Sequence, residues 1–283
     1  MQTSGYLQIC ICERAISLLL FIYRHFLIKE KNLLRRYGEN SYVMITGASS
    51  GIGKALAEKF ALEGWKVAIS ARRKEILDEM AKRENISSYP LDVTNQNQIK
   101  DVFSKIINDF GDLDLCVFSS GTYDPKLEQE INIKQNKFVM ETNFFGVLYC
   151  IKTVEKYFKE KKEGHISIVS SIAGYRGLPN SSGYGPSKAA LTNLTESLYF
   201  DFKKHNVRIS LVSPGFIKTP LTDKNEFQMP FIKSPEFAAD KMFKGLTKSK
   251  SFETHFPKRI SLIFKLLSII PIGLYLKLMR IFK

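Results

Sequence analysis

Short, uniformly apolar runs alternate with stretches of helical period from residue 42 onward. The runs predict strands at residues 42–46, 66–71, 86–91, 114–119, 165–170 and 207–213. The stretches between them predict helices at residues 51–63, 74–82, 96–109 and 135–159, and one more that carries Tyr184. Strands without polar alternation are expected where helices cover both faces of a sheet. The pattern therefore predicts one α/β domain with three layers, built on a doubly wound parallel sheet.

An extension is predicted at each end of this domain. Residues 1–41 form a predicted N-terminal helical extension, residues 42–257 the Rossmann-type domain, and residues 258–283 an apolar, basic helical tail. Residues 15–23 resemble the apolar part of a signal peptide, but Arg24 and His25 end the run and no small-residue cleavage site follows. The run is also too short to span a bilayer as a conventional helix. A helix packed on the domain, or lying on a membrane, is favoured over a signal peptide.

The composition is that of an ordinary globular protein. The chain has 283 residues, 44% of them hydrophobic and 25% charged, which is enough for one large domain with a sizeable core. Its four cysteines stand at positions 10, 12, 116 and 150, and its four histidines are equally scattered. No metal-ligand spacing results, so no metal site is predicted. Free thiols fit a reducing compartment, and we expect a cytoplasmic protein.

The net charge of +14 is concentrated toward the C-terminus. From Lys241 onward ten lysines and arginines stand against Glu253 alone, a net charge of +9, and residues 260–282 are almost continuously apolar. Such a tail suits a peripheral contact with an anionic membrane, or helices that cap an apolar pocket. Lys265 and Pro271 interrupt it, which disfavours a spanning helix. Nucleic-acid binding is not expected, because no recognition module accompanies the charge.

A tyrosine stands four residues before a lysine at three places, an arrangement that puts both side chains on one helix face. The pairs are Tyr157/Lys161, Tyr184/Lys188 and Tyr199/Lys203. An ammonium beside a phenol favours the phenolate and lowers the tyrosine pKa from about 10, giving an acid/base usable near neutral pH. Three equivalent pairs in a lysine-rich chain make the spacing alone weak evidence. Only the surroundings of each pair can separate them.

A glycine-rich turn follows the first predicted strand and precedes a predicted helix. It reads Thr-Gly-Ala-Ser-Ser-Gly-Ile-Gly over residues 46–53. Glycines let the backbone approach a pyrophosphate, and the helix N-terminus supplies N–H donors and positive potential. A plain turn is the alternative, but the strand before it and the helix after it favour a dinucleotide site. The candidate contacts are Gly47, Ser49, Ser50, Gly51, Ile52 and Gly53.

Two arginines follow the second predicted strand, where a site selecting NAD usually carries an acid. Arg72 is the candidate that pairs with a ribose 2′-phosphate, so NADP(H) is the preferred cofactor and NAD(H) the alternative. A solvated helix start is the plain interpretation of Arg72 and Arg73. Asp92, followed by Val93 after the third strand, can accept a hydrogen bond from an adenine amino group, but a helix N-cap would look the same.

Taken together, these motifs resemble the classical short-chain dehydrogenase/reductase family over residues 40–260. The turn matches the family's cofactor motif in every glycine, and Ser171 lies thirteen residues before Tyr184, the family's spacing for its catalytic serine. Tyr157 has Phe144 at that offset, and Tyr199 has Pro186. Other matches are Asn143 in the long predicted helix, and Pro214, Gly215, Ile217 and Thr219 after the sixth strand.

The resemblance implies a role for each matched residue. Tyr184 would be the general acid in carbonyl reduction, Lys188 would lower its pKa and bind the nicotinamide ribose, and Ser171 would hydrogen-bond the substrate oxygen. Asn143 would help to hold a proton-relay water. Ser120 and Gly121 would border the cofactor, although residues 119–121 read Ser-Ser-Gly where the family has Asn-Ala-Gly. A second departure is Ser50, where members that prefer NADP often carry a basic residue.

The substrate is predicted to be hydrophobic. Residues 221–236 follow the nicotinamide segment and are typical of a mobile lid, with Phe227, Met229 and Phe231 making the pocket apolar. We therefore expect an NADP(H)-dependent reductase of a lipid-like ketone, such as a 3-oxoacyl chain, a sphingoid base or a steroid. We also expect a homodimer or homotetramer. The alternative is a non-enzymatic cofactor-binding scaffold or sensor at a membrane surface.

Overall fold

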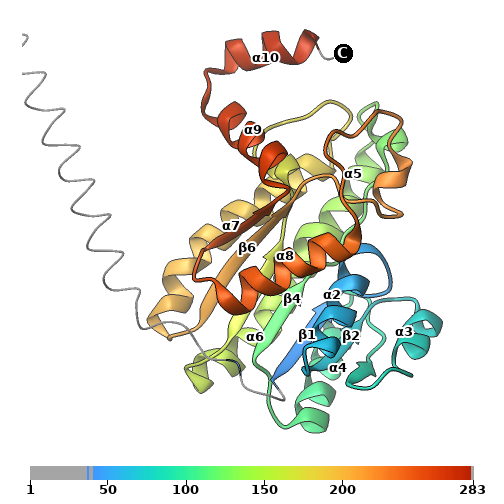
Figure 1. Ribbon diagram of the computed structural model, residues 1–283, viewed down its shortest axis with the longest axis vertical. Helices are drawn as coiled ribbons and strands as arrows, with labels where there is room; N and C mark the ends of the chain where they lie inside the picture. The colour runs from blue at the N-terminus through green and yellow to red at the C-terminus, as the bar shows by residue number, and fades with distance from the viewer. Residues whose placement is uncertain (1–36, 38–40, 282–283) are drawn as a thin grey trace, which may run out of the picture.

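A sheet of parallel strands forms the centre of the molecule (Figure 1). The computed structural model describes residue 37 and residues 41–281. The strand order is β3-β2-β1-β4-β5-β6-β7, so the order reverses between β1 and β4 and the predicted doubly wound sheet is confirmed. The strands are β1 (Tyr42–Thr46), β2 (Lys66–Ser70), β3 (Ile86–Ser88), β4 (Leu115–Phe118), β5 (His165–Val169), β6 (Arg208–Pro214) and β7 (Glu253–Phe256).

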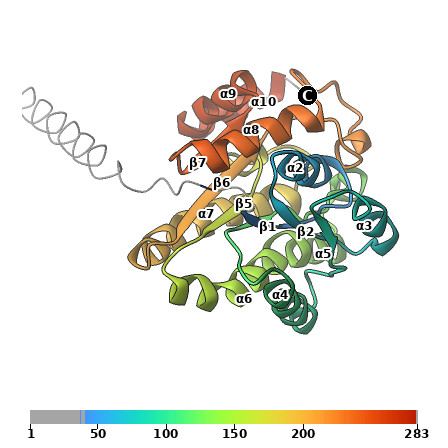
Figure 2. The same cartoon turned by 60° about the horizontal axis from the view of Figure 1, so that its bottom comes forward.

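Helices cover both faces of the sheet, which explains why the strands are apolar throughout. One face packs against α2 (Gly51–Leu62), α3 (Lys74–Met80) and α8 (Pro235–Lys248). The other packs against α4 (Gln96–Phe110), α6 (Gly146–Lys161) and α7 (Tyr184–Lys204) (Figure 2). Within β1, Val43 and Ile45 join the first of these cores and Met44 the second. The three predicted layers are therefore present: helices, sheet and helices, with one apolar core on each face of the sheet.

The structure differs from the prediction in three elements. The edge strand β7 was not predicted, because in Glu-Thr-His-Phe only Phe256 is fully buried and no apolar run exists. Helix α8 was not predicted either. The helix expected at residues 135–159 is instead α5 (Ile133–Met140), a π-helical turn (Glu141–Phe145) and α6 in direct succession. A π-helical turn inside an α-helix is rare and is frequently found at functional sites.

The two predicted extensions differ in what the structure describes. The N-terminal helical extension lies outside the described residues except for Tyr37 and Ser41; the Tyr37 hydroxyl is 3.1 Å from Nδ1 of His165. The C-terminal tail is helical, with α9 (Lys258–Ile269) and α10 (Ile272–Ile281). Among the described helices none is both long and apolar enough to cross a bilayer.

The aromatic cluster under α2 provides a test of the first core. Phe60 is fully buried, with its ring centroid 4.8 Å from Trp65 and 5.0 Å from Phe243. We expect Phe60→Ala to lower the free energy of unfolding by about 3–5 kcal/mol, because it removes apolar contacts and leaves a cavity. Leu62→Ala on the same helix is the control, since Leu62 is 84% exposed and should change stability by less than about 0.5 kcal/mol. Urea denaturation measures both; equal effects would contradict this packing.

Candidate active site

Two cavities meet at the carboxyl ends of the strands. The first is a cleft of about 400 Å³ that runs from the glycine-rich turn to helix α7. Every residue predicted to contact the cofactor lines it. These residues are Gly47, Ser49, Ser50, Gly51, Ile52, Gly53, Arg72, Asp92, Val93, Ser120, Gly121, Tyr184, Lys188, Pro214, Gly215, Ile217 and Thr219.

The floor of this cleft is set by close backbone approach at the glycine-rich turn. Gly47 has φ +70°, and a Cβ there would lie 2.8 Å from the carbonyl oxygen of Ser119. A Cβ on Gly53 would lie 2.4 Å from the carbonyl oxygen of Gly47. Thr46 Oγ1 also accepts a hydrogen bond from the Ser119 backbone N–H (3.1 Å). The turn therefore packs tightly on the end of β4 with no side chain in the way, and the start of α2 faces the cleft as a phosphate site requires.

A basic corner forms between the turn and the end of β2. Arg73 Nη2 donates to the hydroxyls of Ser49 and Ser50, each at 2.8 Å, and Arg72 lines the same cleft. The sequence pattern indicated Arg72 as the phosphate contact, and the contact of Arg73 with the turn was not predicted. The two adjacent arginines in the sequence were the signal that could have indicated this contact. The contact of Arg73 with the turn nevertheless depends on tertiary packing, which local spacing in the sequence does not encode. Guanidinium and hydroxyl donors together suit a phosphate group.

Asp92 does not cap a helix, which was the alternative interpretation of this residue; it closes a turn. Its Oδ1 accepts from the Thr94 backbone N–H (2.9 Å) and from the Thr94 hydroxyl (2.8 Å), which closes a turn after β3. The N-cap of α4 is Asn95, whose side chain accepts from the backbone N–H of Gln98. The carboxylate of Asp92 therefore faces the cleft without capping a helix.

Three of the four predicted catalytic residues, Ser171, Tyr184 and Lys188, line the cleft. Lys188 is buried, and its Nζ donates to the carbonyl oxygen of Val169 (3.0 Å) and lies 5.7 Å from the centroid of the Tyr184 ring. Ser171 follows β5; its hydroxyl accepts from the backbone N–H of Ala173 (3.1 Å), so it also caps the short turn that follows the strand. Ser171 and Tyr184 both line the cleft.

Asn143 lies behind the cleft, in the π-helical turn. It is fully buried; its Oδ1 accepts from the backbone N–H of Thr122 (2.7 Å), and its Nδ2 donates to the Thr122 carbonyl oxygen and to Ser187 Oγ. A Cβ on Gly121 would lie 3.5 Å from Asn143 Oδ1 and 3.6 Å from Lys188 Nζ. Gly121 therefore leaves a small gap that borders the amide and the ammonium. Asn143 itself ties the loop after β4 to helix α7.

The expected effect of Lys188 on the pKa of Tyr184 is wrong for this structure. Burial raises the pKa of Tyr184; the Ser171 hydroxyl opposes this rise, and the negative charge of Glu128 adds to it. Burial also lowers the pKa of Lys188 to about 8. The physical reason is common to both groups, because burial disfavours the charged form of each. Ser171, rather than Lys188, is the group that stabilises the phenolate here.

Two residues that the sequence analysis missed hold Tyr184 in place. Glu128 is buried, and its Oε2 accepts from the backbone N–H groups of Gly183 (2.9 Å) and Tyr184 (3.0 Å) at the start of α7. A carboxylate there satisfies otherwise unpaired donors and complements the helix dipole. The Tyr123 ring lies 4.7 Å from the Tyr184 ring, centroid to centroid. Neither residue belongs to a motif, so no sequence signal identified them.

The other two tyrosine–lysine pairs lie away from both cavities and have structural contacts. The Tyr157 hydroxyl donates to Asp112 (2.7 Å), and Lys161 forms an ion pair with the same carboxylate. Lys203 Nζ donates to the Tyr199 hydroxyl (3.1 Å) on helix α7. The tertiary structure therefore separates the three pairs as their neighbours in sequence predicted.

The second cavity, of about 520 Å³, opens from the catalytic residues toward the C-terminal helices. Ser171 and Tyr184 line it as well as the first cleft, so the two cavities join at these side chains. Its apolar wall is supplied by distant parts of the chain. The wall residues are Ile172, Leu178, Phe216, Leu221, Phe227, Phe264 and Met279.

The predicted lid forms one side of this cavity, with two corrections. Phe227 lines the cavity as expected, whereas Met229 and Phe231 do not. Phe231 is instead partly exposed, with the guanidinium of Arg259 lying 5.9 Å from the centroid of its ring. Two ion pairs connect the lid to the loop after β4, Lys224–Asp124 at 3.0 Å and Lys126–Glu226 at 3.1 Å.

Comparison with known proteins identifies the family. The family model for short chain dehydrogenases matches residues 41–229. An uncharacterized oxidoreductase of Myxococcus xanthus is 32% identical over 244 residues, which cover 84% of this chain and 96% of that protein. The 3-oxoacyl-(acyl-carrier-protein) reductase FabG of Thermotoga maritima is 34% identical over 191 residues, 66% of this chain and 78% of that enzyme. The protein belongs to the short-chain dehydrogenase/reductase family and is an oxidoreductase.

Solved structures have the same fold. ElxO with NADP bound has a TM-score of 0.68 and 28% identity, covering 76% of this chain and 97% of that one. A short chain dehydrogenase from Burkholderia cenocepacia J2315 in complex with NADP has a TM-score of 0.74 and 24% identity, covering 85% and 98%. The sheet described above is thus the family's fold over most of the chain.

Burial of Lys188 predicts a dependence of stability on pH. Its pKa falls from 10.5 to about 8 on folding, so between these values the unfolded chain binds more protons and the free energy of unfolding rises with pH. We expect Lys188→Met to remove roughly 1–3 kcal/mol of that rise. Lys203→Met, on the same helix but exposed, is the control and should keep the parent's slope. Urea denaturation at a series of pH values measures the slopes, and an unchanged slope in Lys188→Met would contradict the burial argument.

Proposed function

We propose that this oxidoreductase interconverts a ketone and a secondary alcohol with NADP(H) as cofactor, acting on a hydrophobic, lipid-like carbonyl substrate. The observation that carries the proposal is the position of Ser171 and Tyr184, which line both the cleft of predicted cofactor contacts and the apolar cavity. A substrate carbonyl held at these two side chains would have both hydroxyl donors within reach and would face the cleft that would hold the nicotinamide. This is the arrangement that hydride transfer requires.

The chain's own residues supply the proton and the electrostatic stabilisation. Tyr184 is protonated at neutral pH, since burial raises its pKa, and so it can donate a proton to the substrate oxygen. The Ser171 hydroxyl donates a hydrogen bond to the same oxygen as negative charge develops on it. The nicotinamide supplies the hydride when bound. Lys188, already at the cleft wall, would bind the ribose hydroxyls of the cofactor, and Asn143 ties the loop after β4 to helix α7.

The basic corner supports NADP(H) over NAD(H). Arg72 lines the cleft, and Arg73 bonds to the hydroxyls of Ser49 and Ser50. Members of the family that prefer NADP often carry a basic residue at the position of Ser50. Here Arg73 brings that positive charge from the end of β2 instead. The 28% identical neighbour ElxO is described with NADP bound, which agrees with this assignment.

The apolar cavity supports a hydrophobic substrate. Its wall is made by aromatic and aliphatic side chains from the lid, from the loops after β5 and β6 and from both C-terminal helices, including Phe216, Phe227 and Phe264. The relative from Thermotoga maritima is named as a reductase of 3-oxoacyl groups on acyl-carrier protein. A 3-oxoacyl chain is therefore our first candidate, ahead of a sphingoid base or a steroid.

The role of Tyr184 is tested by Tyr184→Phe. We expect kcat for ketone reduction to fall by about 10²–10⁴-fold, because the proton donor is lost, while the Kd for NADPH changes by less than about twofold. Tyr199→Phe is the matched control, since Tyr199 has the same lysine spacing on the same helix and should leave kcat unchanged. NADPH oxidation with a panel of ketones, including a 3-oxoacyl thioester, gives the readout.

Two outcomes would redirect the proposal. Near-normal turnover in Tyr184→Phe would rule out this residue as the acid. NADPH binding by the parent without turnover of any ketone would favour the alternative of a cofactor-binding scaffold or sensor at a membrane surface.

The cofactor assignment is tested by the double variant Arg72→Ala/Arg73→Ala. We expect KM for NADPH to rise by about tenfold or more and KM for NADH by less than about twofold, because only NADPH carries the 2′-phosphate. Arg83→Ala is the control, as Arg83 is exposed and pairs with Glu58 on the surface. If the ratio of the two KM values does not change, the 2′-phosphate site lies elsewhere.

A further inference from the structure

Helices α9 and α10 have an inner face that belongs to the substrate cavity. Ile260 and Tyr275 are buried against the domain, and Phe264 of α9 and Met279 of α10 line the cavity. Figure 1 shows the two helices at the end of the molecule, with α10 outermost. The tail is therefore a wall of the cavity, as one of its two alternatives predicted. The opposite face of α9 and α10 does not line the cavity, and lining the cavity does not account for it.

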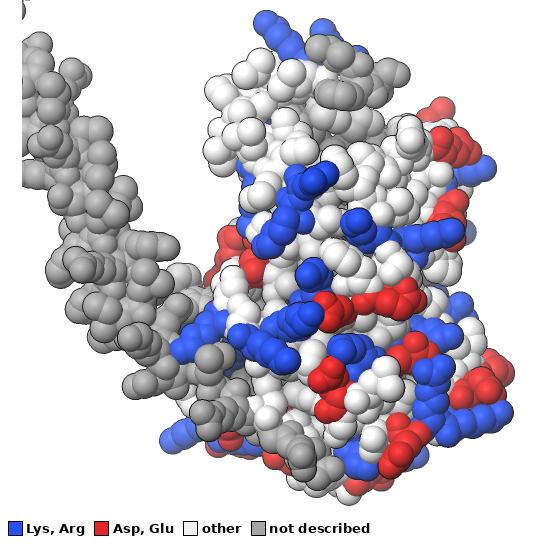
Figure 3. Space-filling model, viewed as in Figure 1, with Lys and Arg blue, Asp and Glu red and all other residues white. Residues whose placement is uncertain are grey.

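The outer face is apolar and carries only positive charge. Its exposed large side chains are Leu262, Ile263, Leu266, Ile269, Ile272, Leu274 and Leu276. Lysines and arginines at positions 258, 259, 277 and 280 are exposed beside them, and residues 257–283 contain no aspartate or glutamate. Figure 3 shows white and blue atoms over these helices and no red ones. An apolar patch of this extent marks a surface that contacts another phase or molecule.

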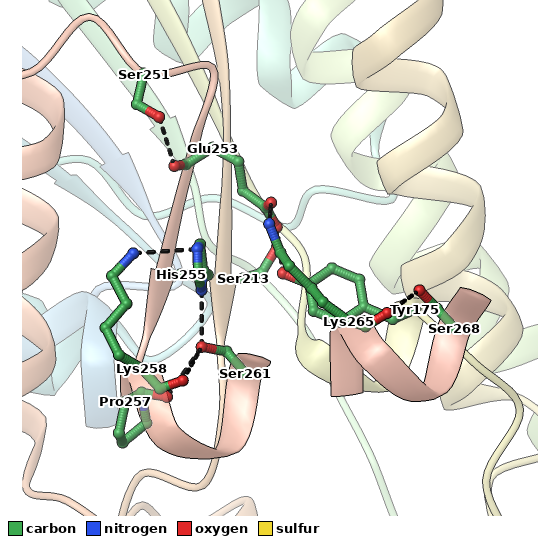
Figure 4. Close-up of polar contacts among 10 residues, drawn as sticks. All are labelled: Tyr175, Ser213, Ser251, Glu253, His255, Pro257, Lys258, Ser261, Lys265 and Ser268. Atoms are coloured by element: carbon green, nitrogen blue, oxygen red, sulfur yellow. Dashed lines mark hydrogen bonds and ion pairs between the residues drawn. The ribbon is translucent and has the colours of Figure 1, made fainter. Parts of the chain in front are cut away.

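Polar contacts hold this face in a fixed orientation on the domain. Lys265 of α9 forms an ion pair with Glu253 of β7, which also accepts from Ser213 Oγ (2.6 Å) and from the Tyr175 hydroxyl (Figure 4). Near the same loop, Arg176 Nη1 donates to the carbonyl oxygen of Ser268 (2.8 Å) at the end of α9. These contacts fix the orientation of α9 on the domain.

The loop that carries these anchors also carries the chemistry. The Arg176 guanidinium lies 4.8 Å from the centroid of the Tyr275 ring, and the Tyr275 hydroxyl donates to the Gly177 carbonyl oxygen. This loop runs from Ser171 to Tyr184. The outer face is thus connected through one loop to the junction of the two cavities.

We propose that the outer face of α9 and α10 docks on a lipid bilayer with anionic headgroups, so that a lipid substrate enters the cavity between these helices without crossing water. Two amphipathic helices with aliphatic side chains and flanking cations lie in the headgroup region rather than across the bilayer. A second copy of this chain is a poorer occupant. An isologous contact would set the same cations against one another, and the sequences of α9 and α10 contain no acid to pair with them.

Docking is tested by vesicle flotation with the full chain. We expect binding to vesicles of phosphatidylcholine and phosphatidylserine in a ratio of roughly two to one, weaker binding to phosphatidylcholine alone, and release by salt. The variant Leu266→Glu/Ile269→Glu changes side chains that are 61% and 78% exposed and should lose about tenfold or more of the bound fraction. The control Leu62→Glu/Phe200→Glu changes residues of similar exposure, 84% and 66%, and should bind as the parent does.

The charge contribution has its own pair of variants. Lys277→Glu/Arg280→Glu should abolish the preference for phosphatidylserine, because it reverses two of the four exposed cations beside the apolar face and so offsets the charge of Lys258 and Arg259. Lys82→Glu/Lys156→Glu changes the net charge equally at exposed positions on the domain and should keep the preference. Equal loss in both pairs would mean that net charge alone, rather than this face, attracts the bilayer, and would overturn the proposal.

Of this proposal, only the entry of substrate rests on the proposed function; docking itself does not. The remaining outcomes therefore test docking separately from the enzymatic activity. Binding is read without substrate, and reduction of a water-soluble 3-oxoacyl thioester is read without vesicles. Thioester turnover within about twofold of the parent in Leu266→Glu/Ile269→Glu, together with lost flotation, supports docking. Undiminished flotation of that variant, or absent flotation of the parent, overturns it. A parent dimer that this variant dissociates would assign the face to a second copy instead.

Discussion

The contact between helix α7 and the loop after β5 sets the distance between Tyr184, Lys188 and Ser171. A Cβ on Gly174 would lie 2.8 Å from the Lys188 carbonyl, so only glycine allows the helix to approach this closely. Glu128 fixes the start of the same helix through two backbone N–H groups. The shared junction of the two cavities follows from this packing. Moving α7 outward would separate the lysine from the cleft and the tyrosine from the serine together.

Burial gives these groups their chemistry and has a cost. The ammonium of Lys188 reaches a carbonyl oxygen in the interior, which costs desolvation energy, and its pKa falls to about 8. The phenol of Tyr184 moves in the opposite direction for the same reason. Burial of either group costs stability, so stability alone does not explain their position. Ionisable groups with perturbed pKa values cluster at functional sites, which does explain it. The fully buried amide of Asn143 has its hydrogen bonds satisfied and stabilises the loop beside them.

The C-terminal helices connect the catalytic centre to the surface. One face of α9 and α10 completes the apolar cavity, and an ion pair with β7 and carbonyl contacts with the catalytic loop hold that face in place. The cavity would otherwise be open at this end, because the lid covers only one side of it. Binding of an apolar substrate in the cavity and docking of the apolar outer face on a bilayer then have the same driving force. Both processes reduce the contact of hydrocarbon with water.

The sequence by itself determined the layered fold, the glycine-rich turn and the four candidate catalytic residues. These depend on periodicity and on short spacings, which local backbone geometry converts directly into shared faces and strand ends. Only the tertiary structure decided that Glu128 caps α7, that Arg73 contacts the turn, and that the tail walls the cavity. Glu128 lies 55 residues from Gly183, and Arg176 lies 92 residues from Ser268. Contacts across such distances leave no pattern in the chain. The direction of the Tyr184 pKa shift was decided there too, because burial is a property of packing and not of spacing.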